Sequence, residues 1–239
     1  GLEAANALKS LGLEAHVVEF APRLMPVQLD ADGGDALRAR IEALGVGVHL
    51  SRATQEIVIG EEYAYRMNFN DGEFLETDLI VFSAGIRPQD ALGRAAGLEV
   101  APRGGVVVDN DCRTSDPAIF AIGECASWNG MIFGLVAPGY SMARNVAAQL
   151  AGEPHELFTG ADMSTKLKLL GVDVGSIGDA YAATPGAKSY RYIDEAGASY
   201  RRLVVSPDGQ HVIGAVLVGD NSYYDTCLLY TSDAADDSL

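Results

Sequence analysis

Over the first fifty positions, stretches with helical spacing of apolar residues alternate with stretches typical of strands. Leu2, Ala5, Leu8 and Leu11 recur on one helical face, which predicts a helix over residues 1–13. An apolar run at 15–20 that ends in an acid predicts a buried parallel strand. A second helix is predicted over 30–45 and a further strand over 46–50. This helix–strand–helix–strand order predicts a doubly wound α/β domain.

The next segments show shorter patterns. Residues 57–59, 65–69 and 73–76 predict a small antiparallel group, in which residues 70–72 (NDG) form the hairpin turn. Buried strands are predicted at 79–82 and 119–123, a turn and strand at 103–109, and a helix over 138–150. From Lys166 onward, short strands alternate with predicted turns at 185–186, 195–197 and 207–209. This change of pattern predicts a separate β-rich module.

The charge balance is strongly acidic. The chain has 33 Asp and Glu residues against 17 Lys and Arg residues, a net charge of −16 at pH 7. Such a polyanion argues against nucleic acid as a partner and against docking on anionic membranes. No apolar stretch reaches the roughly 18 residues of a membrane span. Cys112, Cys125 and Cys227 are widely separated and odd in number, which is typical of a reducing cytoplasm. We expect Cys112 and Cys125 to be packing residues.

Both ends of the sequence have unusual features. The first helical pattern starts at Gly1 with no initiator Met and no capping residue, so we expect that the chain begins within a fold. The string CLLYTSDAADD at 227–237 looks like the in-frame translation of a transposon-end sequencing adapter. We therefore expect that residues 227–239 are a sequencing-adapter artifact. Without Asp233, Asp236 and Asp237 the net charge is −16 + 3 = −13, so the acidic character remains.

A first candidate site combines Gly1 with Glu19. A dinucleotide-binding βαβ unit has glycines where a strand turns into a helix, and an acid that binds the adenosine ribose about 20 residues further on. Gly1 fits the last glycine of that fingerprint, and Glu19 follows 18 positions later at a strand end. A helix–strand pair that merely ends in Glu explains this spacing equally well. If the site is real, Glu19 favours NADH over NADPH, and the nearby Arg23 weakens that preference.

A more specific signal is the segment TSDPAIFAIGE at 114–124. It resembles the second FAD motif of the pyridine nucleotide-disulphide oxidoreductase superfamily, with Thr114, Ala121 and Gly123 matching and Glu124 in place of the usual Asp. The resemblance implies that Glu124 binds the ribityl chain of FAD. The segment SAGIRP at 83–88 resembles the superfamily's link between its nicotinamide and flavin domains, where Gly85 lets the backbone pass close to cofactor.

The same resemblance gives a role to the helix that follows residues 135–140. In this superfamily the helix N-terminus points at the flavin, where its partial positive charge stabilises the reduced ring. Val136 and Ala137 are therefore candidate cofactor-binding residues. His16, His49, His155 and His211 form no cluster in the sequence, so we expect structural or solvated histidines and neither a metal site nor a catalytic side chain.

Longer strings narrow the resemblance to one family. EFAPRLM at 19–25, IGECASW at 122–128, FGLVAPGY at 133–140, KLKLLGVDVG at 166–175 and GAVLVGD at 214–220 all resemble NAD(P)H-dependent nitrite reductase large subunits. The similarity runs nearly continuously from residue 1 to about residue 220. It implies an α/β fold of partial doubly wound FAD/NAD(P)-binding Rossmann-like domains, followed by a small β-rich module.

The resemblance also implies a domain order. We expect an NAD(P)H-binding domain without its first strand at 1–88, the second half of an FAD-binding domain at 89–152 and the β-rich module at 160–226. In the whole enzyme, FAD and NADH (or NADPH) would supply electrons to iron–sulfur and sirohaem centres in absent domains, which reduce nitrite to ammonium. The chain has no cysteine set for such clusters. The implied protein partners are a nitrite reductase small subunit and a second copy in a homodimer.

Two other functions fit the same residues. A reductase of rubredoxin or ferredoxin would share the fold without a sirohaem domain, and a non-catalytic nucleotide-binding module would share it without turnover. The DNA downstream of residue 225 would separate the first from a nitrite reductase, and flavin absorbance of the intact protein would test the second. We expect the isolated fragment to be inactive.

Overall fold

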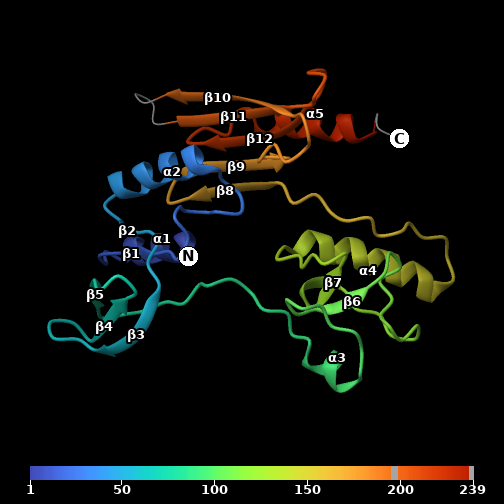
Figure 1. Cartoon of the computed structure of the whole chain (residues 1–239), viewed down its shortest axis with the longest axis horizontal. Coiled ribbons are helices and arrows are strands. Elements are labelled where there is room, and N and C mark those ends of the chain that lie inside the picture. Colours follow the sequence, from blue (N-terminus) through green and yellow to red (C-terminus); the bar gives the residue numbers. More distant parts are fainter. Residues whose placement is uncertain (195–198, 237–239) are drawn as a thin grey trace. The chain divides into compact units, whose positions relative to one another are not determined.

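The computed structural model describes residues 1–194 and 199–236, and the chain divides into two compact units. One unit comprises Gly1–Ser83 together with Ser164–Leu239, and the other comprises Ala84–Met163. Figure 1 shows the elements of both units along the chain. No helix of the described residues is both long and apolar enough to cross a membrane. The domain boundaries expected from the sequence stay a prediction.

The N-terminal α/β part of the first unit, residues 1–50, has the predicted order of elements. They are α1 (Leu2–Ser10), β1 (His16–Val18), α2 (Ala31–Ala43) and β2 (Gly47–His49). β1 and β2 pair in parallel, as a doubly wound domain requires. α2 begins at Asp30, whose side chain accepts a hydrogen bond from the Gly33 N–H at 3.1 Å. That bond satisfies one of the N–H groups that a helix start leaves without a partner.

A three-stranded antiparallel sheet follows, as predicted. Its strands are β3 (Thr54–Ile59), β4 (Tyr65–Phe69) and β5 (Phe74–Thr77). Gly72 lies in the turn between β4 and β5 with φ +88°, a conformation that glycine adopts without strain. The turn chemistry of residues 70–72 therefore identified the hairpin correctly.

The predicted buried strand at 79–82 is wrong. These residues form no strand, and the side chains of Leu79, Val81 and Phe82 are 55%, 51% and 75% exposed. Among the described residues, β1 and β2 pair only with each other. An apolar run becomes a buried strand only where a neighbouring strand satisfies its backbone groups, and no described strand lies beside this one.

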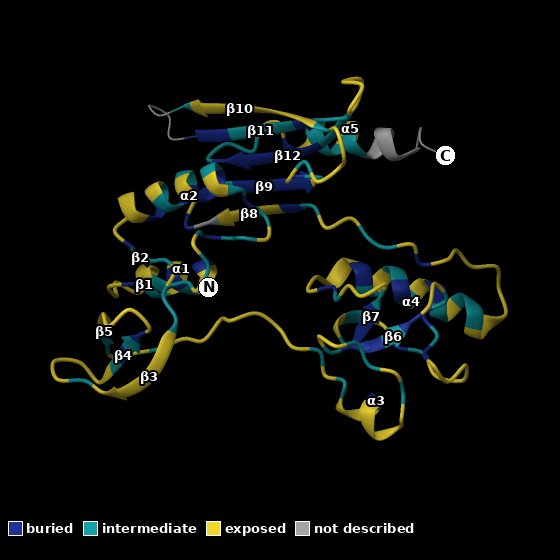
Figure 2. Ribbon diagram, viewed as in Figure 1, coloured by how far each residue is buried: buried dark blue, intermediate teal, exposed yellow. Residues whose placement is uncertain are grey.

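The β-rich module is a five-stranded antiparallel sheet in the order β10-β11-β12-β9-β8. The strands are β8 (Thr165–Leu169), β9 (Val172–Gly178), β10 (Lys188–Asp194), β11 (Ser199–Val205) and β12 (Val212–Val218), and α5 (Tyr224–Asp236) follows them. Gly186 and Gly209 have positive φ in two of the predicted turns. The third predicted turn, at 195–197, lies outside the described residues. Figure 2 shows β9 and β12 buried and the edge strand β10 exposed.

The core of the first unit joins the N-terminal α/β part to this sheet. α2 packs against β9, β11 and β12, and Leu37 and Ile41 of α2 are fully buried in one cluster with Val174, Tyr200 and Val216. Burial of such side chains stabilises a fold by roughly 1.5–3 kcal/mol each. The sheet of the β-rich module is therefore part of the packing that holds α2 in place.

The second unit is built around a parallel pair of strands. Its elements are α3 (Ala91–Ala95), β6 (Val106–Val108), the single 3-10 turn η1 (Gly123–Cys125), β7 (Ala126–Trp128) and α4 (Val136–Ala151). Its core cluster includes Val106, Val108, Ala126, Phe133 and Met142. α4 ends at Gly152, which has φ +71° and closes the helix as expected.

The predicted strand at 119–123 is also wrong. Phe120 makes only a single bridge, to Arg113, and Ile119 and Ile122 are 37% and 38% exposed. β6 and β7 pair with each other and with no further strand of the described chain. The apolar run is therefore an extended segment that bridges residues 112–114 over a short length, and the chain then turns at Gly123.

Candidate functional site

Gly1 and Glu19 lie in the first unit. Gly1 is the N-cap of α1, its nitrogen donates to Ser83 Oγ at 2.7 Å, and a Cβ built on Gly1 would meet nothing within 4 Å. The Glu19 N–H continues the β1–β2 pairing by donating to the His49 carbonyl at 2.9 Å. Glu19 Oε1 accepts the Ala21 N–H at 2.8 Å. The carboxylate is thus fixed at the end of β1, and no described residue donates to its second oxygen.

Arg23 is tied into the loop that follows Glu19. Its Nε donates to the Leu29 carbonyl at 2.9 Å and its Nη2 donates to the Pro26 carbonyl at 3.3 Å. Its stem lies against Gly34, where an added Cβ would come within 2.9 Å of the Arg23 Cβ. The guanidinium is a structural part of the loop, which argues against the expectation that Arg23 weakens a preference for NADH.

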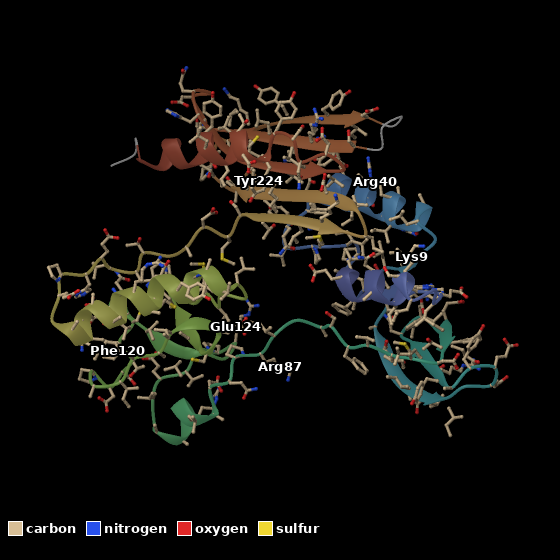
Figure 3. The ribbon with its side chains drawn as sticks, turned by 180° about the vertical axis from the view of Figure 1, so that it is seen from behind. Lys9, Arg40, Arg87, Phe120, Glu124 and Tyr224 are labelled. Atoms are coloured by element: carbon tan, nitrogen blue, oxygen red, sulfur yellow. The ribbon has the colours of Figure 1, made fainter. Side chains whose placement is uncertain are left out.

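In the second unit, Gly123 and Glu124 form the short turn η1 ahead of β7. Gly123 has φ +73°, and a Cβ there would meet nothing within 4 Å. The Glu124 side chain, labelled in Figure 3, is exposed and bonds to no described residue. Thr114 is buried and stabilises the preceding turn, because its hydroxyl donates to the Asp116 carbonyl at 3.0 Å. The motif therefore presents one carboxylate outward from a fixed turn.

The N-terminus of α4 has no cap. The N-cap residue Leu135 makes no side-chain hydrogen bond, and the first turn contains no acidic residue. Val136 is 71% exposed and Ala137 is exposed, while Pro138 has no N–H to offer. The backbone N–H groups of Val136 and Ala137 are available donors at the partly positive end of a sixteen-residue helix.

Two residues that the sequence reasoning missed join α4 to the turn at Gly123. A Cβ on Gly139 would lie 3.4 Å from the Gly123 Cα, so the helix and the turn approach closely. The Gly123 N–H donates to Met142 Sδ at 3.3 Å, and Met142 is fully buried. Gly139 and Met142 are three residues apart and therefore lie on one face of α4. This spacing was the sequence signal that the two residues contact the same neighbouring segment.

Gly85 also belongs to the second unit. It has φ +82° and is exposed, and the next side chain, Ile86, lies near Gly134, where a Cβ would be 3.6 Å from Ile86 Cδ1. Through this contact, the segment that follows Gly85 lies beside the residues just before α4. The structure thus gathers Gly123 and Glu124 with the start of α4 in one unit, and places Gly1 and Glu19 in the other.

The histidines depart from expectation in one respect. His16 Nδ1 and His49 Nε2 are 3.1 Å apart, so the prediction that the histidines form no cluster is wrong for this pair. The cause is the parallel register, which sets His16 opposite Gly47 and leaves room for both rings. Burial, then His16, then Arg52 lower the pKa of His49. No group of three or more potential metal ligands occurs among the described residues.

Cys112 is a packing residue of the second unit. Cys112 is fully buried, and burial together with Asp109 and Asp111 raises the pKa of its thiol to about 11. All three cysteines are free of disulfides. At neutral pH the Cys112 side chain is therefore an unreactive thiol.

Comparison with known proteins identifies the family. Residues 1–151 match the model of the pyridine nucleotide-disulphide oxidoreductase family. The chain belongs to that family. Residues 164–228 match a second model, the C-terminal domain of rubredoxin NAD+ reductase. This member of the family has the mixed α/β fold and the β-rich module that the sequence predicted.

Its sequence is similar to those of nitrite reductase large subunits, as the sequence motifs indicated. It is 61% identical over 228 residues to the NAD(P)H nitrite reductase large subunit of Klebsiella oxytoca, covering 95% of this chain and 24% of the relative. It is 59% identical over 229 residues to the NADH nitrite reductase large subunit of Escherichia coli, covering 95% and 27%. The chain thus spans about a quarter of the length of these relatives.

A solved structure supports the fold. The NAD-dependent persulfide reductase of A. fulgidus matches with a TM-score of 0.81 and 25% identity, covering 97% of this chain and 46% of that one.

Proposed function

We propose that this chain is the electron-input part of a nitrite reductase large subunit, binding FAD and NADH in the longer protein. The observation that carries the flavin site is the contact between the Glu124 turn and the uncapped start of α4. The nitrite assignment is supported by the 61% identity across nearly the whole chain.

The residues of the second unit suit a flavin. Glu124 offers a carboxylate acceptor for ribityl hydroxyls, and the N–H groups of Val136 and Ala137 offer donors for the carbonyl end of the ring. The positive φ and open surroundings of Gly85 and Gly123 leave room where a side chain would project. When bound, FAD accepts hydride from a reduced nicotinamide and releases electrons one at a time.

The residues of the first unit suit NADH. Glu19 is held by the Ala21 N–H with one oxygen open, so it can accept hydrogen bonds from a ribose diol. A 2′-phosphate at that position would be repelled by the same carboxylate. Arg23 donates to two loop carbonyls, which holds its guanidinium in the loop rather than leaving it free to bind a 2′-phosphate.

In the longer protein, the electrons would pass to iron–sulfur and sirohaem centres carried by other segments, and nitrite would be reduced to ammonium. A small nitrite reductase subunit and a homodimeric assembly belong to the same proposal, as does a cytoplasmic location. The match of residues 164–228 to a rubredoxin NAD+ reductase domain supports a second candidate, a reductase of rubredoxin or ferredoxin.

The test is to clone the reading frame that contains this chain and purify its product. We expect bound FAD and sirohaem, and NADH-dependent formation of ammonium from nitrite. A flavoprotein that lacks sirohaem and reduces rubredoxin would support the second candidate. A product without flavin absorbance would contradict both and favour a non-catalytic nucleotide-binding module.

A further inference from the structure

A tyrosine from the β-rich module holds the loop that follows Glu19. Tyr181 Oη lies 2.6 Å from the Pro26 carbonyl oxygen and 2.8 Å from the Leu29 carbonyl oxygen, so its single proton is shared between them. These are the two carbonyls that Arg23 also contacts. The far end of the loop is therefore held from two sides, while Ala21 holds its near end to Glu19.

Tyr181 is itself fixed by its turn. The Asp179 carboxylate accepts the N–H groups of Ala183 and Thr184, both at 2.8 Å. The Asp179 N–H donates to the Ile213 carbonyl at 2.8 Å, which anchors the turn next to β12. Burial of Asp179 opposes its ionisation, but these backbone hydrogen bonds outweigh burial and hold its pKa below the usual value. The hydroxyl of Tyr181 thus projects from a rigid support.

A second contact ties the same two parts together at the start of α2. Tyr200 Oη donates to Asp30 Oδ2 at 2.6 Å and Arg202 Nη1 donates to the same oxygen at 2.9 Å, with Tyr200 fully buried. Arg202 Nη2 reaches back to the Tyr181 carbonyl at 3.4 Å. The end of the loop and the cap of the following helix are both held by the sheet.

We propose that Tyr181 is a positioning residue for nucleotide binding: it fixes residues 20–29 and, through them, the direction of the Glu19 carboxylate. The inference rests on the proposed role of Glu19 in binding the ribose. The β-rich module would then contribute to the affinity for NADH without touching the nucleotide. Loss of one hydrogen bond worth about 1 kcal/mol corresponds to roughly a fivefold change in affinity.

The experiment uses the longer protein that contains this chain, with Tyr181→Phe as the test variant. Tyr190→Phe is the matched control, because Tyr190 is an exposed tyrosine of β10 in the same β-rich module, and its hydroxyl bonds to no described residue. We expect Tyr181→Phe to raise KM and Kd for NADH roughly fivefold, with kcat unchanged, and to speed amide hydrogen exchange within 20–29 by a similar factor. Tyr190→Phe should change neither quantity.

Glu19→Gln separates this inference from the function proposed above. If Glu19→Gln weakens NADH binding and Tyr181→Phe does not, the positioning role is wrong and the ribose contact stands. If Glu19→Gln leaves NADH binding unchanged, the ribose contact is wrong, and amide exchange decides whether Tyr181 holds the loop. Unchanged exchange at 20–29 in Tyr181→Phe overturns the inference in either case.

Discussion

The backbone N–H of Gly123 donates to the thioether sulfur of Met142 at 3.3 Å, so the turn that carries Glu124 is bonded directly to α4. A Cβ on Gly139 would lie 3.4 Å from the Gly123 Cα, so α4 and the turn are also in van der Waals contact at this point. The carboxylate and the helix N-terminus that we assign to FAD are therefore one rigid group. Its geometry depends on a buried side chain that the cofactor need not touch.

That dependence predicts the effect of replacing Met142. Met142→Leu keeps the volume and loses the sulfur acceptor, so it should cost less than about 1.5 kcal/mol of unfolding free energy yet lower flavin occupancy. Met142→Ala should cost about 2–5 kcal/mol, because it opens a cavity in the core of this unit. Urea unfolding and the flavin-to-protein absorbance ratio of the longer protein measure both effects. Full flavin content in Met142→Leu would show that the N–H···S bond is dispensable.

Glu124 is expected to orient the flavin without transferring protons. Glu124→Ala should lower flavin occupancy in the longer protein because the ribityl chain loses its acceptor, whereas Glu124→Asp should largely keep it. The side chain is exposed and bonds to no described residue, so neither change should alter the stability of the unit. Flavin content after dialysis is the measurement. Complete flavin retention in Glu124→Ala would refute this role.

Glu19 should make the longer protein prefer NADH. Hydrogen bonds to a charged group are worth roughly 1.5–3 kcal/mol, so Glu19→Ala should weaken NADH binding on the order of tenfold to a hundredfold. Since Arg23 is engaged by Pro26 and Leu29, Arg23→Ala should destabilise the loop without a selective loss of NADPH binding. Steady-state kinetics with both nucleotides test this. Equal kcat/KM values for NADH and NADPH in the unmodified protein would count against the assignment.

Burial of His49 and its contact with His16 predict a dependence of stability on pH. The pKa of His49 is lowered in the folded state, so the unfolded chain binds its proton more readily. Neutral His49 contributes fully to stability above about pH 6.5, the ordinary histidine pKa. This contribution is lost as the pH falls toward the lower pKa that His49 has in the folded state. His49→Gln should therefore reduce the difference between the unfolding free energies at pH 7.5 and pH 5.5. An unchanged pH profile in this variant would rule out His49 as the cause.

Elements that depend on neighbouring residues were predictable from the sequence, whereas those that depend on distant segments were not. The hairpin at 70–72 and the helix α2 follow from a few neighbouring residues, and both were predicted. The apolar runs at 79–82 and 119–123 have the composition of buried strands, but a strand needs a partner supplied from elsewhere. The His16–His49 contact likewise depends on the register of two strands. The bonds from Tyr181 to the loop after Glu19 join segments that no local pattern connects.

The exposed run at 79–82 leads to the last prediction, which concerns the 239-residue chain by itself. Leu79, Val81 and Phe82 are more than half exposed, and no described strand covers them. Apolar surface of this kind favours association between molecules. The residues that we assign to FAD would contact its ribityl and ring end, and we assign no described residue to its pyrophosphate.

We therefore expect the isolated chain to aggregate, to bind FAD substoichiometrically and to oxidise NADH far more slowly than the longer protein. Size-exclusion chromatography, the flavin spectrum and NADH oxidation with an artificial acceptor measure these properties, with the longer protein as the control. Substituting Val81 and Phe82 together by Lys should reduce aggregation without restoring flavin, because the charge prevents association but supplies no pyrophosphate site. A monomeric, yellow and active 239-residue protein would show that these residues alone complete the flavin site.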